Sequence, residues 1–292
     1  MRLTAVFAGF ALFSSSAVAQ QHLQERIRDI AADTHGTVSV ACSLPGTPLN
    51  CDLDPTARAP MQSVFKLPLV LTVLHQVEQG KFTLEQPIPF RISDLILPKP
   101  HSPLQDKYPH AGVEVPLRDL MQMTVTFSDN TAADMLLRLA GSPKVVNHYI
   151  ASLGVTGFHL RDDERALHRK HDLQYRNWFE PRGAVQLLRR INDHSPLTAE
   201  HTALLLEWMS LPSGRLEANL PSGTKVYHKS GSSDVDKGIA GATNDIGLIA
   251  LRDGRQLAIA VFVADSRADS TTRLQVIARI GRCVYDYATQ KQ

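Results

Sequence analysis

Strand-like segments lie at both ends of this chain, and a long helical stretch separates them. Between about Ser63 and Met209 the apolar residues recur at helical spacing with long loops. Strands from both ends most simply share one antiparallel sheet, with the terminal helices packed on it and a helical domain inserted. The strand-like segments are residues 36–44 (GTVSVACSL), 49–54 (LNCDLD), 224–231 (TKVYHKSG), 238–251 (GIAGATNDIGLIAL) and 256–264 (QLAIAVFVA).

Local signals define the connections and the domain boundaries. Residues 21–33 and a segment from about Thr271 to the end have helical periodicity. Asp253-Gly254 favours a tight hairpin between the last two strands, and residues 36–54 are predicted to form another. We expect a sheet domain from residues 20–59 and 211–292 and a helical domain from residues 60–210.

Composition excludes several classes of protein. The 292 residues are 43% hydrophobic and 21% charged, so the chain can bury a large core. Lys and Arg number 31 and Asp and Glu number 29, a balance that does not suggest a nucleic-acid partner. There are twelve histidines, but the HRKH loop lacks the further ligands that a catalytic zinc requires, so no metal is expected.

The N-terminal stretch MRLTAVFAGFALFSSSAVAQQ has the pattern of a secretory signal. One Arg precedes an apolar run, and the small residues Ala17 and Ala19 suggest cleavage after Ala19. The alternative is a first core helix. No later segment reaches the roughly 18 apolar residues of a membrane span, so we expect a secreted or periplasmic protein without one.

Two of the three cysteines bracket a predicted turn. If Gly46 and Thr47 centre a hairpin, Cys42 and Cys51 face each other at a distance that permits a disulfide. The bridged and the free forms are equal alternatives from the sequence. Cys283 falls in a helical pattern and is predicted to be a small buried residue.

The first candidate for chemistry is the pair Ser63 and Lys66. If a helix begins near Ser63, the two side chains share one face of its first turn. A lysine in apolar surroundings can have a lowered pKa and accept the proton of a serine nucleophile. Alone the pair is a weak signal, since a capping serine and a lysine that reaches solvent give the same pattern.

Two further motifs follow in the sequence. Ser128-Asp129-Asn130 interrupts a helical segment and offers a hydroxyl and an amide at a connection between helices. Lys229-Ser230-Gly231 lies at the end of a predicted strand, where a glycine allows a ligand to approach the backbone. Each motif alone is ordinary; the three together are specific.

With these three motifs the sequence resembles the class A serine β-lactamases, whose motif set is Ser-x-x-Lys, Ser-Asp-Asn and Lys-Thr-Gly. The stretches ATNDIGLIAL, QYRNW and SPLQDKYPHAG are similar to one branch of that class, which contains cephalosporinases and extended-spectrum enzymes. The resemblance implies an α+β, two-domain penicillin-recognising fold with a five-stranded antiparallel sheet. It also implies a β-lactam substrate, no cofactor and a monomer.

The acid that distinguishes a hydrolase within this fold is expected at Glu164. In DDERALH, Glu164 is followed four residues later by His168, which resembles the Glu-x-x-x-His form of the class A loop. The commoner form ends in Asn, so the bracing of the loop by His168 is left open. Ser230 replaces the usual Thr of the third motif and keeps its hydroxyl.

The resemblance implies the catalytic roles. Ser63 attacks the lactam carbonyl, and the backbone N–H groups of Ser63 and Ser232 stabilise the oxyanion. Lys66, or Glu164 acting through a water, takes the serine proton; the sequence leaves both open. Ser128 passes a proton to the departing nitrogen, and Glu164 activates the deacylating water.

The remaining site residues are expected to bind substrate. Lys229, Ser230 and Arg215 are predicted to face the substrate carboxylate, with Lys237 as the alternative to Arg215. Asn130 is predicted to bind the side-chain amide of the substrate, and His101 to lie at the pocket rim. His168 is also counted among the substrate-binding residues.

Two functions follow from these residues. The first is hydrolysis of penicillins or cephalosporins through an acyl-enzyme. The second is a β-lactam sensor or a penicillin-binding transpeptidase that acylates without efficient turnover, and Glu164 favours the first.

Overall fold

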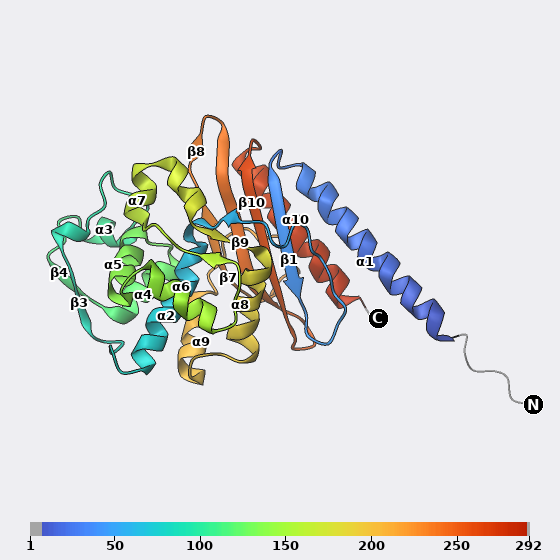
Figure 1. Ribbon diagram of the computed structural model, residues 1–292, viewed down its shortest axis with the longest axis horizontal. Helices are drawn as coiled ribbons and strands as arrows, with labels where there is room; N and C mark the ends of the chain where they lie inside the picture. The colour runs from blue at the N-terminus through green and yellow to red at the C-terminus, as the bar shows by residue number, and fades with distance from the viewer. Residues whose placement is uncertain (1–7, 291–292) are drawn as a thin grey trace, which may run out of the picture.

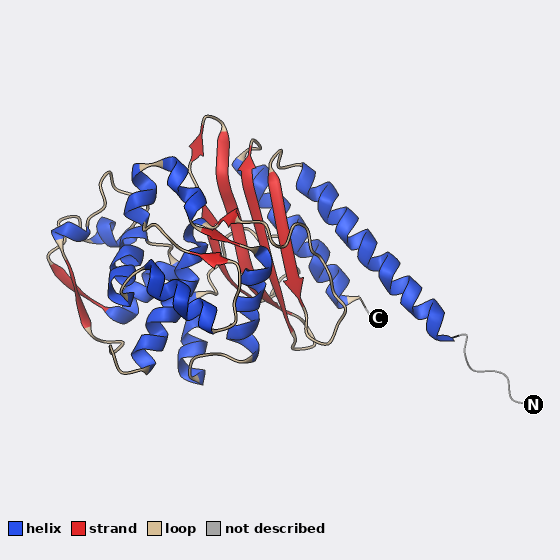
Figure 2. Cartoon of the chain, in the orientation of Figure 1, coloured by secondary structure: helices blue, strands red, loops and turns tan. Residues whose placement is uncertain are grey.

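The computed structural model describes residues 8–290, and a five-stranded antiparallel sheet lies at its centre (Figures 1 and 2). The strand order is β1-β10-β9-β7, and the short β8 pairs with β9. Strands from both ends of the chain therefore share one sheet, as predicted. Their bounds are Thr37–Ser43 (β1), Val226–Ser232 (β7), Val235–Asp236 (β8), Ile239–Ala250 (β9) and Gln256–Ser266 (β10).

Both faces of the sheet are buried, which explains the almost continuous apolar runs of β9 and β10. Successive side chains of a strand point to opposite faces. Ile259 and Val261 of β10 belong to one core cluster, and the intervening Ala260 and Phe262 belong to the other. A sheet covered on both faces has little room for polar positions.

One face is covered by the two terminal helices, α1 (Ala8–Ala32) and α10 (Ser270–Thr289), which lie side by side in Figure 1. The predicted helix at residues 21–33 is the final part of a longer α1. The predicted signal peptide falls in part on residues 1–7, which lie outside the described residues. No helix within residues 8–290 is both long enough and apolar enough to cross a bilayer.

The other face is covered by helices from the middle of the chain. α8 packs on β1 and β10. α2 runs through the core on this face of the sheet, and most of its residues are buried. These helices are α2 (Lys66–Glu78), α3 (Pro103–Lys107), α4 (Leu117–Thr126), α5 (Asn130–Ala140), α6 (Pro143–Ser152), α7 (Glu164–Arg169), α8 (Pro181–Asp193) and α9 (Ala199–Trp208).

The middle segment also contains elements that periodicity did not predict. Two small antiparallel sheets, of order β2-β6-β5 and β3-β4, and three 3-10 turns connect its helices within the described residues. Their bounds are Ala59–Pro60 (β2), Pro87–Phe90 (β3), Val113–Pro116 (β4), Phe158–His159 (β5), Trp178–Phe179 (β6), Gln62–Phe65 (η1), Ile92–Asp94 (η2) and His171–Arg176 (η3).

The predicted N-terminal hairpin is only partly formed. β1 pairs along its length with β10, and a single bridge joins Val40 to Leu53. Cys42 and Cys51 nevertheless form a disulfide, with 5.8 Å between their Cα atoms. Cys283 is free and buried, as predicted.

Candidate active site

Ser63 lies in the 3-10 turn η1, and the α-helix α2 begins only at Lys66. The helical conformation thus begins near Ser63, as expected, but as a 3-10 turn that becomes α-helical at Lys66. The spacing keeps its meaning, because residues i and i+3 eclipse each other in a 3-10 helix. Ser63 is partly exposed at a cavity, whereas Lys66 is fully buried beneath it.

The Lys66 ammonium joins the predicted catalytic groups. Its Nζ lies 3.0 Å from Glu164 Oε1 and 2.7 Å from the backbone oxygen of Ser128. It also donates to Asn130 Oδ1. Lys66 and Glu164 are both buried, so their opposite charges interact with little screening by solvent. A proton can therefore pass between the two groups without leaving the protein.

Ser128 lies at the connection between α4 and α5, as predicted, and its φ of +57° is in the left-handed region. That conformation is costly for a residue other than glycine and is often found at functional sites. Ser128 Oγ lies 3.1 Å from Lys229 Nζ and 3.5 Å from Lys66 Nζ. The hydroxyl thus lies between two cations.

The second cation, Lys229, is buried in β7. Burial, together with the nearby charges of Lys66 and Arg215, holds the pKa of the Lys229 ammonium well below its usual value. A lysine in that environment gives up a proton more readily than one in water. Lys229 can therefore supply a proton to the Ser128 hydroxyl.

Glu164 is the first residue of α7, whose N-terminus is capped from two sides. Asp163 accepts a hydrogen bond from Ala166 N at 2.8 Å. Asp134, from α5, accepts hydrogen bonds from Glu164 N and Arg165 N at 2.8 and 3.0 Å. Burial and the charges of Asp163 and Glu164 raise the pKa of Asp134 to about 8. Asp134 was not predicted to contribute, because in the sequence it looks like one acid of an amphipathic helix.

His168 braces the loop that carries Glu164. Its Nδ1 lies 2.8 Å from Glu164 O and must donate there, because a carbonyl only accepts. Its Nε2 lies 3.4 Å from Asn130 Nδ2 and accepts the amide hydrogen. These contacts assign the neutral Nδ1–H tautomer to His168. The histidine thus links the position of the Glu164 backbone to Asn130.

The edge strand β7 forms the opposite wall of the site. A Cβ on Gly231 would lie 2.8 Å from Met61 O and 3.0 Å from Ser63 N, so only glycine allows β7 to pack this closely on η1. This contact brings the backbone of β7 next to Ser63. Such proximity is required if the backbone N–H groups of Ser63 and Ser232 are to share one oxyanion.

Arg215 approaches β7 from the loop after α9. Its guanidinium donates to Gly231 O at 3.0 Å, to Asn244 O, and to Ser232 Oγ at 2.8 Å. These bonds hold a positive charge at the cavity wall. Lys237, the alternative cation, lies between β8 and β9 and does not line the cavity.

The structure brings the predicted site residues together around one cavity of about 680 Å³. Lys66 and Lys229 lie behind Ser128, which separates them from the open space. His101 lies at the rim, with Nε2 2.8 Å from Phe127 O. The predicted residues that line the cavity are Ser63, His101, Ser128, Asn130, Glu164, His168, Arg215, Ser230 and Ser232.

Two glutamines that the sequence analysis missed also line this cavity. Gln62 donates to Gln174 Oε1 at 2.7 Å and so ties η1 to η3. A Cβ on Gly241 would meet the Gln174 amide at 2.5 Å. Gly241, the second glycine of GIAGAT, is the only sequence signal for this contact. A single glycine in a strand can occur for several structural reasons, so the signal is not specific.

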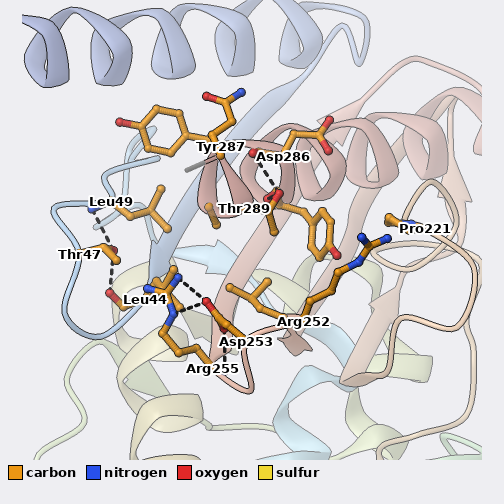
Figure 3. Close-up of a pocket in the computed structure, with 14 residues that line it drawn as sticks. Leu44, Thr47, Leu49, Pro221, Arg252, Asp253, Arg255, Asp286, Tyr287 and Thr289 are labelled. Carbon is orange, nitrogen blue, oxygen red and sulfur yellow. Dashed lines mark hydrogen bonds and ion pairs between the residues drawn. The ribbon is translucent and has the colours of Figure 1, made fainter. Parts of the chain in front are cut away.

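Another cavity, of about 540 Å³, lies at the C-terminal end of α10 and contains none of the predicted site residues. Figure 3 shows Asp286 and Tyr287 of α10 on one side and Asp253 and Arg255 of the β9–β10 turn on another. Asp253 and Arg255 are already paired with each other.

One group among the described residues has the donor atoms of a metal site. The polar atoms of Glu217, His228 and Asp245 all lie within 4.8 Å of one another, but none of the three lines the cavity around Ser63. His228 already contacts oxygen atoms through both ring nitrogens. The group is therefore an ion pair of His228 and Asp245 with Glu217 as an acidic neighbour.

The fold and the cavity define a class of protein. In these enzymes a nucleophilic serine at the start of a helix lies close to buried lysines and a carboxylate, which can accept and donate protons. A model of the Beta-lactamase enzyme family matches residues 22–288, and the chain belongs to that family. The resemblance to class A serine β-lactamases is thereby confirmed.

Individual relatives agree with this assignment. The extended-spectrum β-lactamase PER-1 of Pseudomonas aeruginosa is 36% identical over 291 residues, which are 99% of this chain and 94% of that protein. The β-lactamase VEB-1 of Pseudomonas aeruginosa is 33% identical over 80% of this chain and 79% of its own length. A crystal structure of a β-lactamase from Chitinophaga pinensis superposes with a TM-score of 0.88 at 38% identity, covering 92% of this chain and 100% of that one.

Proposed function

We propose that this chain hydrolyses the lactam amide of penicillins and cephalosporins, with Ser63 as nucleophile and Glu164 as the base for deacylation. β-Lactam hydrolysis, and with it resistance to these antibiotics, is the activity expected of the family to which the chain belongs. The observation that carries the proposed roles is the 3.0 Å contact between Lys66 and Glu164 beneath the cavity that holds Ser63.

In the acylation step, Ser63 Oγ attacks the lactam carbonyl carbon and loses its proton. That proton can go to Lys66 or, through a water, to Glu164, since the two groups are in contact. The C–N bond then breaks, and the nitrogen takes the proton of Ser128. The proton that Ser63 gave up replaces it through Lys66, whose Nζ lies 3.5 Å from Ser128 Oγ, so Lys66 and Glu164 regain their starting charges before deacylation. The N–H groups of Ser63 and Ser232 stabilise the oxyanion.

Deacylation requires a base of a different kind. Glu164 removes a proton from a water that attacks the ester carbonyl, and the proton then returns to the Ser63 oxygen as the acid leaves. Asp134 and His168 hold the backbone of Glu164 and so direct its carboxylate. Asn130 and His101 contact the substrate side chain, while Ser230 and Arg215 receive its carboxylate. The buried Lys229 contributes its positive charge from behind Ser128 without touching the carboxylate.

The first prediction tests this division of roles with Glu164→Ala. The variant should still acylate on Ser63 but fail to release product, because deacylation loses a general base that contributes roughly 10²–10⁴-fold. Mass spectrometry after mixing with a chromogenic cephalosporin should show an adduct on Ser63 that persists far longer than in the wild type. Ser63→Gly, mixed in parallel, should form no adduct.

Two outcomes would contradict the proposal. Turnover by Glu164→Ala at the wild-type rate would make Glu164 an ordinary loop acid. A wild-type protein that also stays trapped as an adduct, with one burst and no steady turnover, would favour the β-lactam sensor or transpeptidase.

We also propose that residues 1–19 are a signal peptide and that the mature chain acts as a periplasmic or secreted monomer. The composition of residues 1–19 supports export, and the Cys42–Cys51 disulfide fits an oxidising compartment. N-terminal sequencing of the exported protein and light scattering test the cleavage site and the monomer.

A further inference from the structure

We propose that the buried pair of His228 and Asp245 is a positioning device for Arg215, because it holds the segment that presents the guanidinium to the substrate carboxylate. This inference rests on the proposed function. Neither residue lines the cavity, so each would act through Arg215 and not by touching substrate.

The pair is anchored to the segment on both sides of Arg215. His228 Nδ1 lies 3.0 Å from Asp245 Oδ1, and His228 Nε2 lies 2.8 Å from Leu211 O. Asp245 Oδ2 accepts a hydrogen bond from Leu216 N at 3.3 Å and lies 3.4 Å from Ser213 Oγ. Two strands, β7 and β9, thereby fix the backbone before and after residue 215.

The contacts require a charged pair. Both ring nitrogens of His228 face oxygen acceptors, and only the imidazolium can donate from both. Burial lowers the pKa of His228, but Asp245 and then Glu217 raise it, so that the result lies above the usual value. Burial raises the pKa of Asp245, but the positive charges of His228 and Arg215 lower it by more, so the pKa lies below its usual value. The favoured state is the ion pair.

The other anchors of the segment are apolar or lie at its ends: Leu216 is fully buried in the core beside α10, and Met209 O accepts a hydrogen bond from His228 N at 2.8 Å. Glu217 Oε1 accepts from Ser213 N at 2.6 Å and from Gly214 N, but these bonds are internal to the loop. Leu211, Pro212 and Gly214 are exposed. The polar side-chain contacts that join residues 211–216 to the sheet are those of His228, Asp245 and the Arg215 guanidinium.

Arg215 depends on this placement. Its three bonds to Gly231, Asn244 and Ser232 require the guanidinium to cross the end of β7. A charged group bound in fixed geometry recognises a carboxylate better than a mobile one, because less freedom is lost on binding. Loss of the ion pair should therefore weaken recognition of the substrate carboxylate while Ser63, Lys66 and Glu164 keep their contacts.

The test is a double-mutant cycle on two substrates. Asp245→Asn, Arg215→Ala and the double variant are assayed with a chromogenic cephalosporin and with its methyl ester, which lacks the negative charge. Asp245→Asn and Arg215→Ala should each lower kcat/KM for the free acid about ten- to a hundredfold, mainly through KM, and change the ester little. The double variant should be no worse than Arg215→Ala, because both remove one interaction.

Glu78→Gln is the matched control. It removes another carboxylate paired with a histidine, His201, at 2.9 Å and outside the cavity. This variant should leave the ratio of acid to ester unchanged. If Asp245→Asn does not fold, Ser213→Ala replaces it in the cycle, since it removes one contact to Asp245 without leaving a buried charge. The expected loss is then smaller but still confined to the acid.

An equal loss on both substrates, or full additivity with Arg215→Ala, would overturn the inference and leave the proposed function intact. A wild type that turns over neither substrate would overturn the proposed function and, with it, this inference.

Discussion

At the scale of single residues, the Ser128 hydroxyl lies within 3.5 Å of two lysine side chains. Lys66 and Lys229 both approach the Ser128 hydroxyl, and Lys66 is balanced by Glu164. Lys66, Lys229 and Glu164 are thus connected through contacts at the base of the cavity, where the Ser128 hydroxyl can both donate and accept a proton. A proton taken from the nucleophile can therefore be passed on to the leaving nitrogen within this group of residues.

The second prediction concerns which cation meets the substrate carboxylate. Arg215→Ala should lower kcat/KM for a penicillin about ten- to a hundredfold, because a hydrogen bond to a charged group contributes roughly 1.5–3 kcal/mol. Lys237→Ala should have little effect, since Lys237 does not line the cavity. The opposite ranking in steady-state kinetics would show that Lys237 is the binding cation.

The third prediction concerns Asp134. Its pKa of about 8 lies above the usual value near 4, so between those pH values the folded protein keeps a proton that the unfolded chain loses. The free energy of unfolding should therefore fall as pH rises from 5 to 7, by at most about 1.4 kcal/mol per pH unit from this group. Asp134→Asn, which does not titrate, should flatten this dependence.

Urea unfolding at pH 5 and pH 7 measures this pH dependence of the free energy of unfolding. Asp269→Asn is the control, because Asp269 caps α10 and its pKa is lowered by hydrogen bonds from Thr272. That carboxyl is ionised throughout the range, so its removal should leave the slope unchanged. An unchanged slope in Asp134→Asn would mean that Asp134 is ionised in the folded protein.

At the scale of elements, the sequence predicted what depends on local pattern. The apolar runs of β9 and β10 are long, and Asp253-Gly254 separates them, so their hairpin formed as expected. The three motifs lie where they were expected, at η1, before α5 and in β7. The small sheets were missed because strands of two to four residues carry too little periodicity.

Contacts between distant residues were the part that the sequence could not reveal. Asp134 meets Glu164 N, and His228 meets Asp245, only after the chain has folded. A single polar residue in an amphipathic element is usually a solvated one, so neither stood out. The site residues themselves came from recognition of three motifs, and their catalytic roles remain predictions.

The fourth prediction follows from the contact between β7 and η1. Gly231→Ala should lower kcat/KM at least about a hundredfold, because its Cβ would collide with backbone atoms of η1 and separate the two proposed oxyanion donors. Gly254→Ala has open space around its Cβ and is the steric control, although its φ of +87° disfavours alanine. Near-normal activity of Gly231→Ala would mean that β7 can move without loss of the oxyanion site.

At the scale of the whole molecule, the disulfide joins β1 to the loop that follows it and does not line the cavity around Ser63. The fifth prediction is that reduction, or Cys42→Ser with Cys51→Ser, lowers stability by about 2–3 kcal/mol at most, because the closed loop is short. Activity at 25 °C should be retained. Mass analysis after alkylation of the unfolded, unreduced protein should label Cys283 alone; labelling of all three thiols would exclude the bridge.

The division into a sheet domain of residues 20–59 and 211–292 and a helical domain of residues 60–210 stays a proposal. α8 belongs to the second segment by sequence yet packs on β1 and β10, so the two parts share a buried face. The cavity takes Ser63, Asn130 and Glu164 from one segment and Arg215 and Ser232 from the other. Both parts are therefore needed for the site.

The pairing of β1 with β10 has a consequence for the order in which the molecule can assemble. Val38 pairs with Val263, so the first strand in the sequence can take its place only when the last one, β10, is present. Contacts between such distant segments form slowly. β7, which contributes Ser230, Gly231 and Ser232 to the cavity wall, pairs with β9, and β9 pairs with β10. A chain that lacks β10 should therefore be inactive, because both β1 and β9 lose the strand with which they pair.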